Sequence, residues 1–122
     1  MKRFDSLAIT LALLFFYSGK VFAEKVNQEG VKRQMSHPIL EKIKNGAIVV
    51  DVRTPMEYHA GHYPGAINIP VDQLPARLSE LDKKKEIIVY CASGARSSSA
   101  KMFLEQKGYK VTNAGGLRDM PR

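Results

Sequence analysis

The segment Cys91-Ala-Ser-Gly-Ala-Arg96 places a thiol and a guanidinium on either side of four small residues. Because these side chains cannot fill a loop, backbone N–H groups can turn inward around an anion, and Gly94 can adopt a positive φ. A helix that begins after the loop would add free N–H donors and the positive end of its dipole. The segment predicts an anion-binding loop with the Cys91 thiol at its base, formed by Ala92, Ser93, Gly94, Ala95 and Arg96.

The same loop can activate the Cys91 thiol. A free thiol has a pKa of about 8.5, and lowering that pKa by about two units takes roughly 2.7 kcal/mol. A helix dipole supplies about 0.3–1 kcal/mol, whereas each hydrogen bond to a charged group supplies about 1.5–3 kcal/mol. Several converging N–H groups are therefore enough, and we predict a reactive thiolate. The alternative is a buried cysteine that only fills space.

Strands and helices must position this loop. Apolar runs predict four short strands, over residues 47–52, 66–69, 86–90 and 109–112. Helical patterns and capping residues predict helices over residues 38–44, 55–60, 72–81 and 96–107. This alternation favours an α/β fold, with a small, mostly parallel sheet and helices on both faces. Gly115 and Gly116 follow the last strand and are predicted to let the backbone pass close to the loop.

Residue types at the predicted helix ends indicate their caps. Ser36 can cap the first helix, and Asp72 can cap the third. Thr54-Pro-Met-Glu57 matches a capping box with proline at the first helical position. Glu57 is therefore predicted to cap its helix rather than to act as a catalytic acid.

Asp51 and Arg53 lie at the end of the first predicted strand. Ligands of parallel sheets bind at the carboxyl ends of the strands, so both residues are expected to face the cysteine loop. In one interpretation Asp51 accepts hydrogen bonds from the loop or from an arginine, and Arg53 strengthens the positive field at the thiol. In the other, the two residues form an ion pair with a purely structural role.

Composition limits the classes of protein and of site. A chain of 122 residues with 44% hydrophobic and 25% charged residues is too short for more than one globular domain, and its net charge of +7 favours small anionic ligands. One cysteine excludes an internal disulfide and a cysteine-based zinc site. Gly61 separates His59 from His62, so we expect no metal site. Basic residues lack interleaved aromatic residues, so we expect no nucleic acid partner.

The N-terminal residues have the pattern of a secretory signal peptide. A basic start precedes an apolar run over residues 7–17, and Ala23 suits a small-residue cleavage site. The run is shorter than the about 20 residues of a transmembrane helix, although an uncleaved anchor is an alternative. We predict a signal peptide over residues 1–23 and a single domain over residues 24–122, which is exported to the periplasm as a monomer without stable membrane insertion.

Three segments resemble the signatures of rhodanese-like sulfurtransferase domains. The first runs from Asp51 to Tyr58 and on through Gly61 to Pro70, the second is Tyr90-Cys-Ala-Ser-Gly-Ala-Arg96, and the third is Asn113-Ala-Gly-Gly-Leu117. Together they span most of residues 47–117. The resemblance implies the three-layer rhodanese-like fold, with helices on both faces of a small sheet.

The resemblance also implies a reaction in two steps. The Cys91 thiolate attacks the sulfane sulfur of a small anionic donor such as thiosulfate, and sulfite leaves. Cys91 then carries a persulfide, held by the N–H groups of the loop, and cyanide or a thiol accepts the sulfur. Arg96 is implied to orient the donor and to stabilise the leaving sulfite. No metal or organic cofactor is required.

The chain departs from the family after the Gly-Gly pair, where it lacks the aromatic residue that many members carry. We therefore expect a short or missing last helix and a more open loop. Other functions are a persulfide carrier or redox-stress binding module without turnover, and a phosphatase or arsenate reductase. Phosphatases and arsenate reductases of this fold have five residues between cysteine and arginine, whereas this loop has four. The intact Cys91 and Arg96 argue against an inactive domain.

Overall fold

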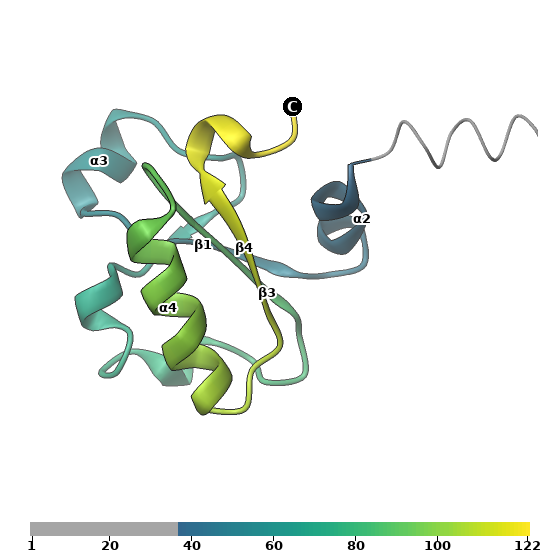
Figure 1. The fold of residues 1–122 in the computed structure, drawn as a ribbon, viewed down its shortest axis with the longest axis vertical. Coiled ribbons are helices and arrows are strands. Elements are labelled where there is room, and N and C mark those ends of the chain that lie inside the picture. Colours follow the sequence, from purple (N-terminus) through teal and green to yellow (C-terminus); the bar gives the residue numbers. More distant parts are fainter. Residues whose placement is uncertain (1–36) are drawn as a thin grey trace, which may run out of the picture. The chain divides into compact units, whose positions relative to one another are not determined.

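Four parallel strands form the sheet of the structure, in the order β2-β1-β3-β4 (Figure 1). The computed structural model describes residues 37–122, so the predicted signal peptide of residues 1–23 lies outside the described residues. The strands are β1 (Ile48–Asp51), β2 (Ile67–Asn68), β3 (Ile87–Cys91) and β4 (Val111–Gly116). All four were predicted, and every pair between them is parallel.

α-Helices and short 3₁₀-helices lie before, between and after these strands. Those of residues 37–122 are α2 (Pro38–Lys44), α3 (Pro55–Ala60), α4 (Ala95–Gln106) and the 3₁₀-helices η1 (Val71–Gln73), η2 (Leu78–Glu80) and η3 (Leu117–Asp119). The longest, α4, lies along β3 and β4 (Figure 1). Within the same residues, no helix has the length and apolar character needed to cross a membrane.

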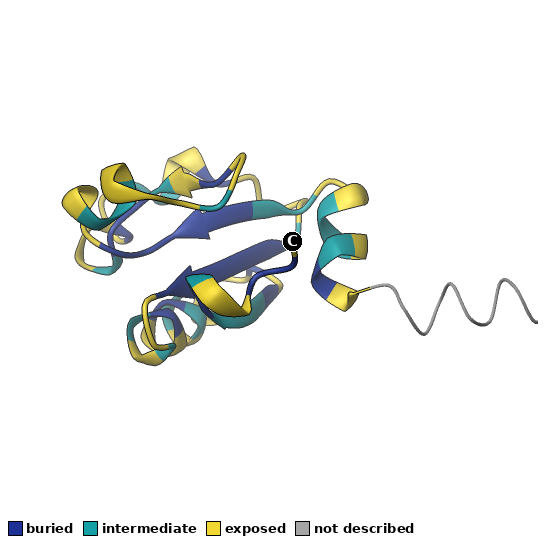
Figure 2. Ribbon diagram, turned by 90° about the horizontal axis from the view of Figure 1, so that it is seen from above, coloured by how far each residue is buried: buried dark blue, intermediate teal, exposed yellow. Residues whose placement is uncertain are grey.

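Both faces of the sheet are covered, and its central strands β1 and β3 are the most enclosed part of the fold (Figure 2). One face packs against α4 through a cluster that contains Val89, Cys91 and Leu104. The other face packs against α2 through a cluster that contains Tyr90 and Ile39. Alternate residues of β3 therefore enter opposite cores, as the pleat of a strand requires. The predicted layers of helices on both faces are confirmed.

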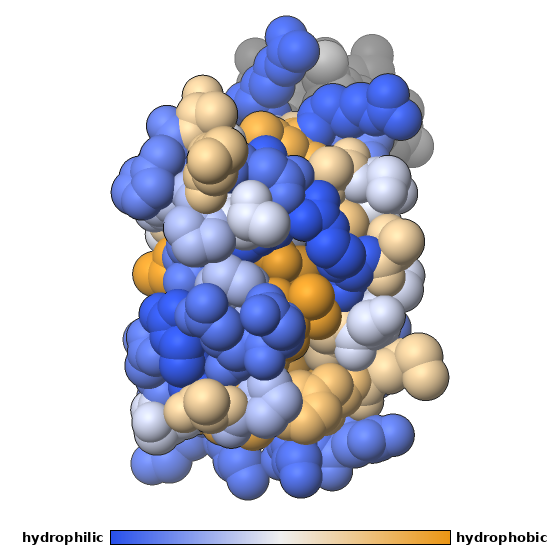
Figure 3. All heavy atoms as spheres, turned by 90° about the vertical axis from the view of Figure 1, so that its left-hand side faces the viewer, coloured by the Kyte–Doolittle hydropathy of each residue, from blue (hydrophilic) through white to orange (hydrophobic). Residues whose placement is uncertain are grey.

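The side of the molecule that carries α3 exposes mostly hydrophilic side chains, with a smaller apolar area at its centre (Figure 3). Among the described residues, the most exposed large apolar side chains are Met56 and Met102. They belong to different helices, α3 and α4. Scattered apolar residues of this kind are common on protein surfaces and define no interface.

Residues 72–81 do not form the predicted helix. The segment contains the end of η1 and the whole of η2, with a turn between them. Bonds across three residues close both 3₁₀ turns, from the Gln73 N–H to the Pro70 carbonyl and from the Leu81 N–H to the Leu78 carbonyl. The Tyr109 hydroxyl donates to the Leu78 and Leu81 carbonyls, so a tertiary contact fixes the end of the segment. Leu74 is nevertheless fully buried in the cluster against α4, so the segment still contributes to the core.

The cap of α2 also differs from the prediction. Nδ1 of His37 accepts the Ile39 N–H at 3.3 Å, and His37 is the N-cap residue. Pro38 occupies the first helical position, which makes the residue before it the cap. The choice of Ser36, which lies outside the described residues, was therefore wrong.

β4 extends to Gly116, beyond its predicted end at Thr112. After an irregularity in the register, Gly115 pairs with Tyr90 and Gly116 pairs with Cys91. The last strand therefore continues alongside β3 as far as the cysteine. A single turn, η3, follows β4, and the expectation of a short last helix is confirmed.

Candidate active site

The cysteine loop is a short connection at the carboxyl end of the sheet. β3 ends at Cys91 and α4 begins at Ala95, so the strand itself provides the cysteine. Gly94 is the N-cap residue of α4, and its φ of 100° lies in the left-handed region that glycine adopts without strain. The predicted positive φ at Gly94 is confirmed. It allows the chain to pass from a buried strand to a helix within a few residues.

Hydrogen-bond donors converge on the Cys91 sulfur, which has no exposed surface. The Gly94 N–H donates to Sγ at 2.9 Å, and Oγ of Ser97 lies 3.4 Å from Sγ. Ser97 is buried in the first turn of α4, and its Oγ also lies 3.0 Å from the Gly94 carbonyl oxygen. Because a hydroxyl has one proton, Ser97 can donate it either to a charged sulfur or to this carbonyl.

These contacts set the pKa of the Cys91 thiol. Burial raises that pKa, because a thiolate loses the solvation of water. Hydrogen bonds from the Ser97 hydroxyl and from the N–H groups of Ser97, Gly94 and Ser93 lower it, and the pKa falls below that of an ordinary thiol. The direction agrees with the sequence prediction. Ser97 was missed, although its place in the first turn after the loop was a usable signal.

Arg96 is bound by Glu57 of α3. The terminal nitrogens Nη1 and Nη2 donate to the two carboxylate oxygens at 2.6 and 2.9 Å. Hydrogen bonding by Arg96 lowers the pKa of Glu57 to about 2, so the carboxylate is charged at neutral pH. Both side chains remain partly exposed, at 37% for Arg96 and 33% for Glu57. This ion pair was not predicted from the sequence, because its partners are far apart in the chain.

Glu57 also completes the predicted capping box. Its Oε1 accepts the Thr54 N–H at 3.3 Å, and the Thr54 hydroxyl accepts the Glu57 N–H at 3.2 Å. The capping prediction is confirmed. It was incomplete, since the same carboxylate caps α3 and neutralises the arginine of the cysteine loop.

Asp51 and Arg53 form a buried ion pair near the loop. Nε and Nη2 of Arg53 donate to the Asp51 carboxylate at distances from 2.7 to 3.1 Å, and the Tyr90 hydroxyl donates to it at 2.8 Å. Arg53 Nη2 also donates to the Gly61 carbonyl at 2.7 Å. Within residues 37–122, no hydrogen bond joins Asp51 to the cysteine loop. The ion pair of the structural interpretation is present, and a contribution of Arg53 to the positive field at the thiol stays a prediction.

Gly116 brings β4 close to the loop. It lies opposite Cys91 in the register of β3 and β4. A Cβ atom at Gly116 would lie 2.4 Å from the Ala92 carbonyl oxygen, far inside van der Waals contact. Only glycine fits here without moving the backbone, which agrees with the predicted close passage of the chain.

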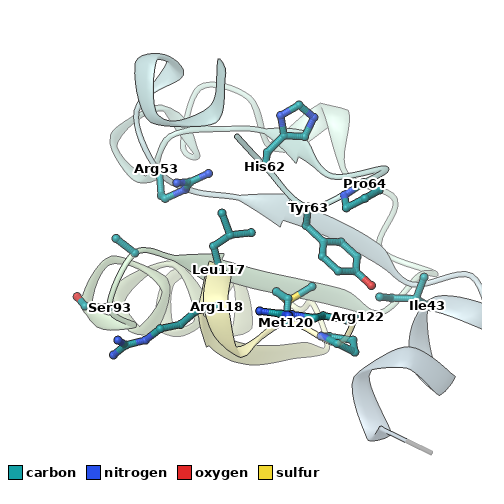
Figure 4. Close-up of a pocket in the computed structure, with 12 residues that line it drawn as sticks. Ile43, Arg53, His62, Tyr63, Pro64, Ser93, Leu117, Arg118, Met120 and Arg122 are labelled. Atoms are coloured by element: carbon teal, nitrogen blue, oxygen red, sulfur yellow. The ribbon is translucent and has the colours of Figure 1, made fainter. Parts of the chain in front are cut away.

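A cavity of about 1070 Å³ adjoins the loop (Figure 4). Arg53 and Ser93 lie at one end of it and Ile43 lies at the other (Figure 4). Its remaining lining residues are His62, Tyr63, Pro64, Ala92, Leu117, Arg118, Met120, Pro121 and Arg122. The cavity thus combines apolar walls with arginine side chains. Two of these arginines follow β4, in the segment where the sequence predicted a more open site.

His62 contacts Tyr58 through both its ring nitrogen and its ring face. His62 Nδ1 lies 2.9 Å from the Tyr58 carbonyl oxygen, and its ring stacks on that of Tyr58 at a centroid distance of 3.7 Å. No group of three or more His, Cys, Asp and Glu side chains in the described part of the chain is arranged to hold a metal ion. His62 therefore orders the end of α3.

The Ser97 hydroxyl offers a direct test of how the thiolate is stabilised. In Ser97→Ala we expect the pKa of Cys91 to rise, because the thiolate loses one donor while its burial remains. Alkylation by iodoacetamide at neutral pH should slow roughly tenfold, the loss of one hydrogen bond of about 1.5 kcal/mol to a charged group. The rate should recover as the pH is raised. Ser98→Ala is the control, and an equal effect there would contradict this role.

The buried ion pair predicts a stability effect. Asp51→Ala leaves the Arg53 guanidinium buried without its partner, so we expect a loss of about 3–5 kcal/mol in the free energy of unfolding. Glu80→Ala breaks the exposed pair with Arg77 and should cost far less, because solvent screens that pair. Urea unfolding measures both variants. Equal costs would show that burial does not govern the Asp51 pair.

Comparisons with known proteins agree with this geometry. Residues 36–119 match the family described as "Rhodanese-like domain". "Sulfurtransferase" of Allochromatium vinosum is 43% identical over 70 residues, which cover 57% of this chain and 65% of that protein. "Thiosulfate sulfurtransferase PspE" of Escherichia coli is 43% identical over 74 residues, which cover 58% of this chain and 71% of that protein.

A solved structure shares the fold. "Rhodanese with anions from E. coli" superimposes with a TM-score of 0.58 and 41% sequence identity, over 62% of this chain and 92% of that one. The family match covers all four strands and the cysteine loop. This protein therefore belongs to the rhodanese-like family of sulfurtransferases.

Proposed function

We propose that the protein transfers sulfane sulfur from thiosulfate to a thiophilic acceptor through a persulfide on Cys91. The observation that carries this proposal is the convergence of the Gly94 N–H and the Ser97 hydroxyl on a buried sulfur. Donors placed in this way stabilise the thiolate that attacks and the persulfide that follows. The name of the Escherichia coli relative supports thiosulfate as the donor.

The proposed loading step needs no proton transfer. The Cys91 thiolate attacks the outer sulfur of thiosulfate and forms a new S–S bond. The original S–S bond breaks, and its electron pair leaves with sulfite. The N–H groups of residues 92–95 hold the donor and the new persulfide, and Arg96 contributes positive charge to the leaving sulfite.

The proposed unloading step regenerates the thiolate. A nucleophile attacks the outer sulfur of the persulfide, and the electron pair of the broken S–S bond returns to Cys91. Cyanide becomes thiocyanate, and an organic thiolate becomes a persulfide. No cofactor takes part in either step.

The cavity beside the loop supports an organic thiol as acceptor. At about 1070 Å³ it is far larger than a cyanide ion needs, and cavities of about 300–1,000 Å³ suit organic ligands. Arg118 and Arg122 are exposed beside apolar walls such as Leu117 and Met120. This combination favours a thiol with an apolar body and a carboxylate.

The alternative is a persulfide carrier that loads without turnover. It is favoured by the complete burial of Cys91. Continuous sulfite release with thiosulfate and a free acceptor separates the two functions, because a carrier loads once and stops. The export of the domain, its place in the periplasm and its monomeric state remain predictions from the sequence.

The first test of the function is the intact mass of the domain after incubation with thiosulfate. We expect a gain of one sulfur atom on the native protein and no gain on Cys91→Ala. Sulfite should appear in the same amount as the bound sulfur. No gain on a folded, reduced protein would remove the thiosulfate reaction and bring phosphatase, arsenate or binding roles forward.

The cavity predicts how thiols unload the persulfide. In the double variant Arg118→Gln, Arg122→Gln, unloading by 3-mercaptopropionate should slow about threefold to tenfold, as expected for a loss of ~1 kcal/mol at exposed charges. Unloading by neutral 2-mercaptoethanol should change little. The double variant Lys84→Gln, Lys85→Gln, at the opposite end of β3, removes the same two charges and controls for net charge. Equal slowing for both thiols would place the acceptor elsewhere.

A further inference from the structure

The Glu57 carboxylate occupies the part of the Arg96 guanidinium that would bind an anionic sulfur donor. Both terminal nitrogens are engaged by Glu57, one oxygen each, at 2.6 and 2.9 Å. This end of a guanidinium is the fork that binds carboxylate, sulfonate or phosphate oxygens in pairs. A donor that is to use both nitrogens must therefore replace Glu57.

Glu57 is held at this place by a second set of contacts. Oε1 accepts hydrogen bonds from the Thr54 N–H and hydroxyl at 3.3 and 3.1 Å, while Glu57 sits in the first turn of α3. The carboxylate is thus fixed before any donor arrives. Because the pair with Arg96 is partly exposed, an anion from solvent can reach it and compete.

The charges around the loop determine how well an anionic donor competes with Glu57 for Arg96. At the loop itself, a thiolate at Cys91 and the Glu57 carboxylate carry two negative charges, against the positive charge of Arg96. The cavity arginines Arg118 and Arg122 are the same in the native protein and in every Glu57 variant, so they do not affect the comparison. A dianion meets more repulsion here than a monoanion of the same shape, because the interaction energy scales with the charge of the ligand. Without the Glu57 charge, the positive charge of Arg96 and the negative charge of the thiolate would cancel.

We propose that Glu57 determines donor specificity, by occupying Arg96 and disfavouring dianionic sulfur donors relative to monoanionic ones. Glu57 acts through Arg96 and does not touch the reacting atoms, so it is a positioning residue. The inference rests on the proposed function, since it concerns the step that loads sulfur onto Cys91. It assigns the site to donors of low charge, such as organic thiosulfonates and organic persulfides, more than to thiosulfate.

Two donors of different charge test this inference. Thiosulfate carries two charges, and the methanethiosulfonate anion carries one because a methyl group replaces one oxygen. Attack by Cys91 on either outer sulfur yields the same persulfide and releases sulfite or methanesulfinate, respectively. The measured quantity is the second-order rate constant of persulfide formation, followed by intact mass after rapid quenching.

Glu57→Gln is the decisive variant, because glutamine still fits the capping box while it removes the charge. We expect the loading constant for thiosulfate to rise about threefold to tenfold more than that for methanethiosulfonate, as expected for one charge removed near the donor. Glu57→Asp keeps the charge and should leave the ratio of the two donors close to that of the native protein.

Two further variants separate charge from structure. Glu80→Gln removes one negative charge from the exposed Arg77–Glu80 pair, and so matches the change in net charge away from the loop. Thr54→Ala weakens the cap of α3 but leaves the charge of Glu57 in place. Neither should change the ratio of loading constants. Melting curves establish that each variant is folded.

The outcomes are distinct. A Glu57→Gln variant that loads both donors faster by the same factor, or neither, overturns the inference. An equal change of the ratio in Glu80→Gln or Thr54→Ala also overturns it, since net charge or the cap would then explain the effect. If the native protein forms no persulfide with either donor, the proposed function fails first, and the mass spectra show this independently of any ratio.

Discussion

The hydrogen bond from the Gly94 N–H to the Cys91 sulfur depends on a single backbone reversal, and the rest of the site depends on that bond. A left-handed glycine turns the chain from β3 into α4 without a side chain in the way. The turn is possible only because β4 leaves room, with glycine at position 116 opposite the cysteine. Strand pairing, loop curvature and thiol chemistry are therefore parts of one constraint at the carboxyl end of the sheet.

Two arginine–carboxylate pairs near this edge have opposite characters. The pair of Asp51 and Arg53 is buried, shared with Tyr90, and joins the end of β1 to the segment after α3. Its burial and extra hydrogen bonds make it costly to break and unsuited to exchange. The pair of Glu57 and Arg96 is partly exposed, so its partners can exchange with ions from solvent. One pair maintains the scaffold, and the other controls charge beside the thiol.

Local patterns predicted most of the fold, because strands buried on both faces appear as continuous apolar runs and caps appear as short motifs. The predicted helix over residues 72–81 was wrong, because tertiary contacts such as the bonds from the Tyr109 hydroxyl to the Leu78 and Leu81 carbonyls fix this segment. The loop and Cys91 were found for the same local reason. Ser97 and the Glu57–Arg96 pair were not, because their roles depend on which side chains meet after α3 and α4 take their places around the sheet.

The burial of Cys91 also protects the sulfur between reactions. An intermolecular disulfide needs a second sulfur about 2.05 Å from Sγ. A sulfur without exposed surface can be reached by a small donor that enters the loop, but less readily by the thiol of another folded protein. Since the sequence has no other cysteine, no disulfide can form within these 122 residues either. A bound sulfane sulfur adds one atom beyond this protected position. The fold thus disfavours protein thiols at the empty site, while a sulfur carried beyond Cys91 comes closer to their reach.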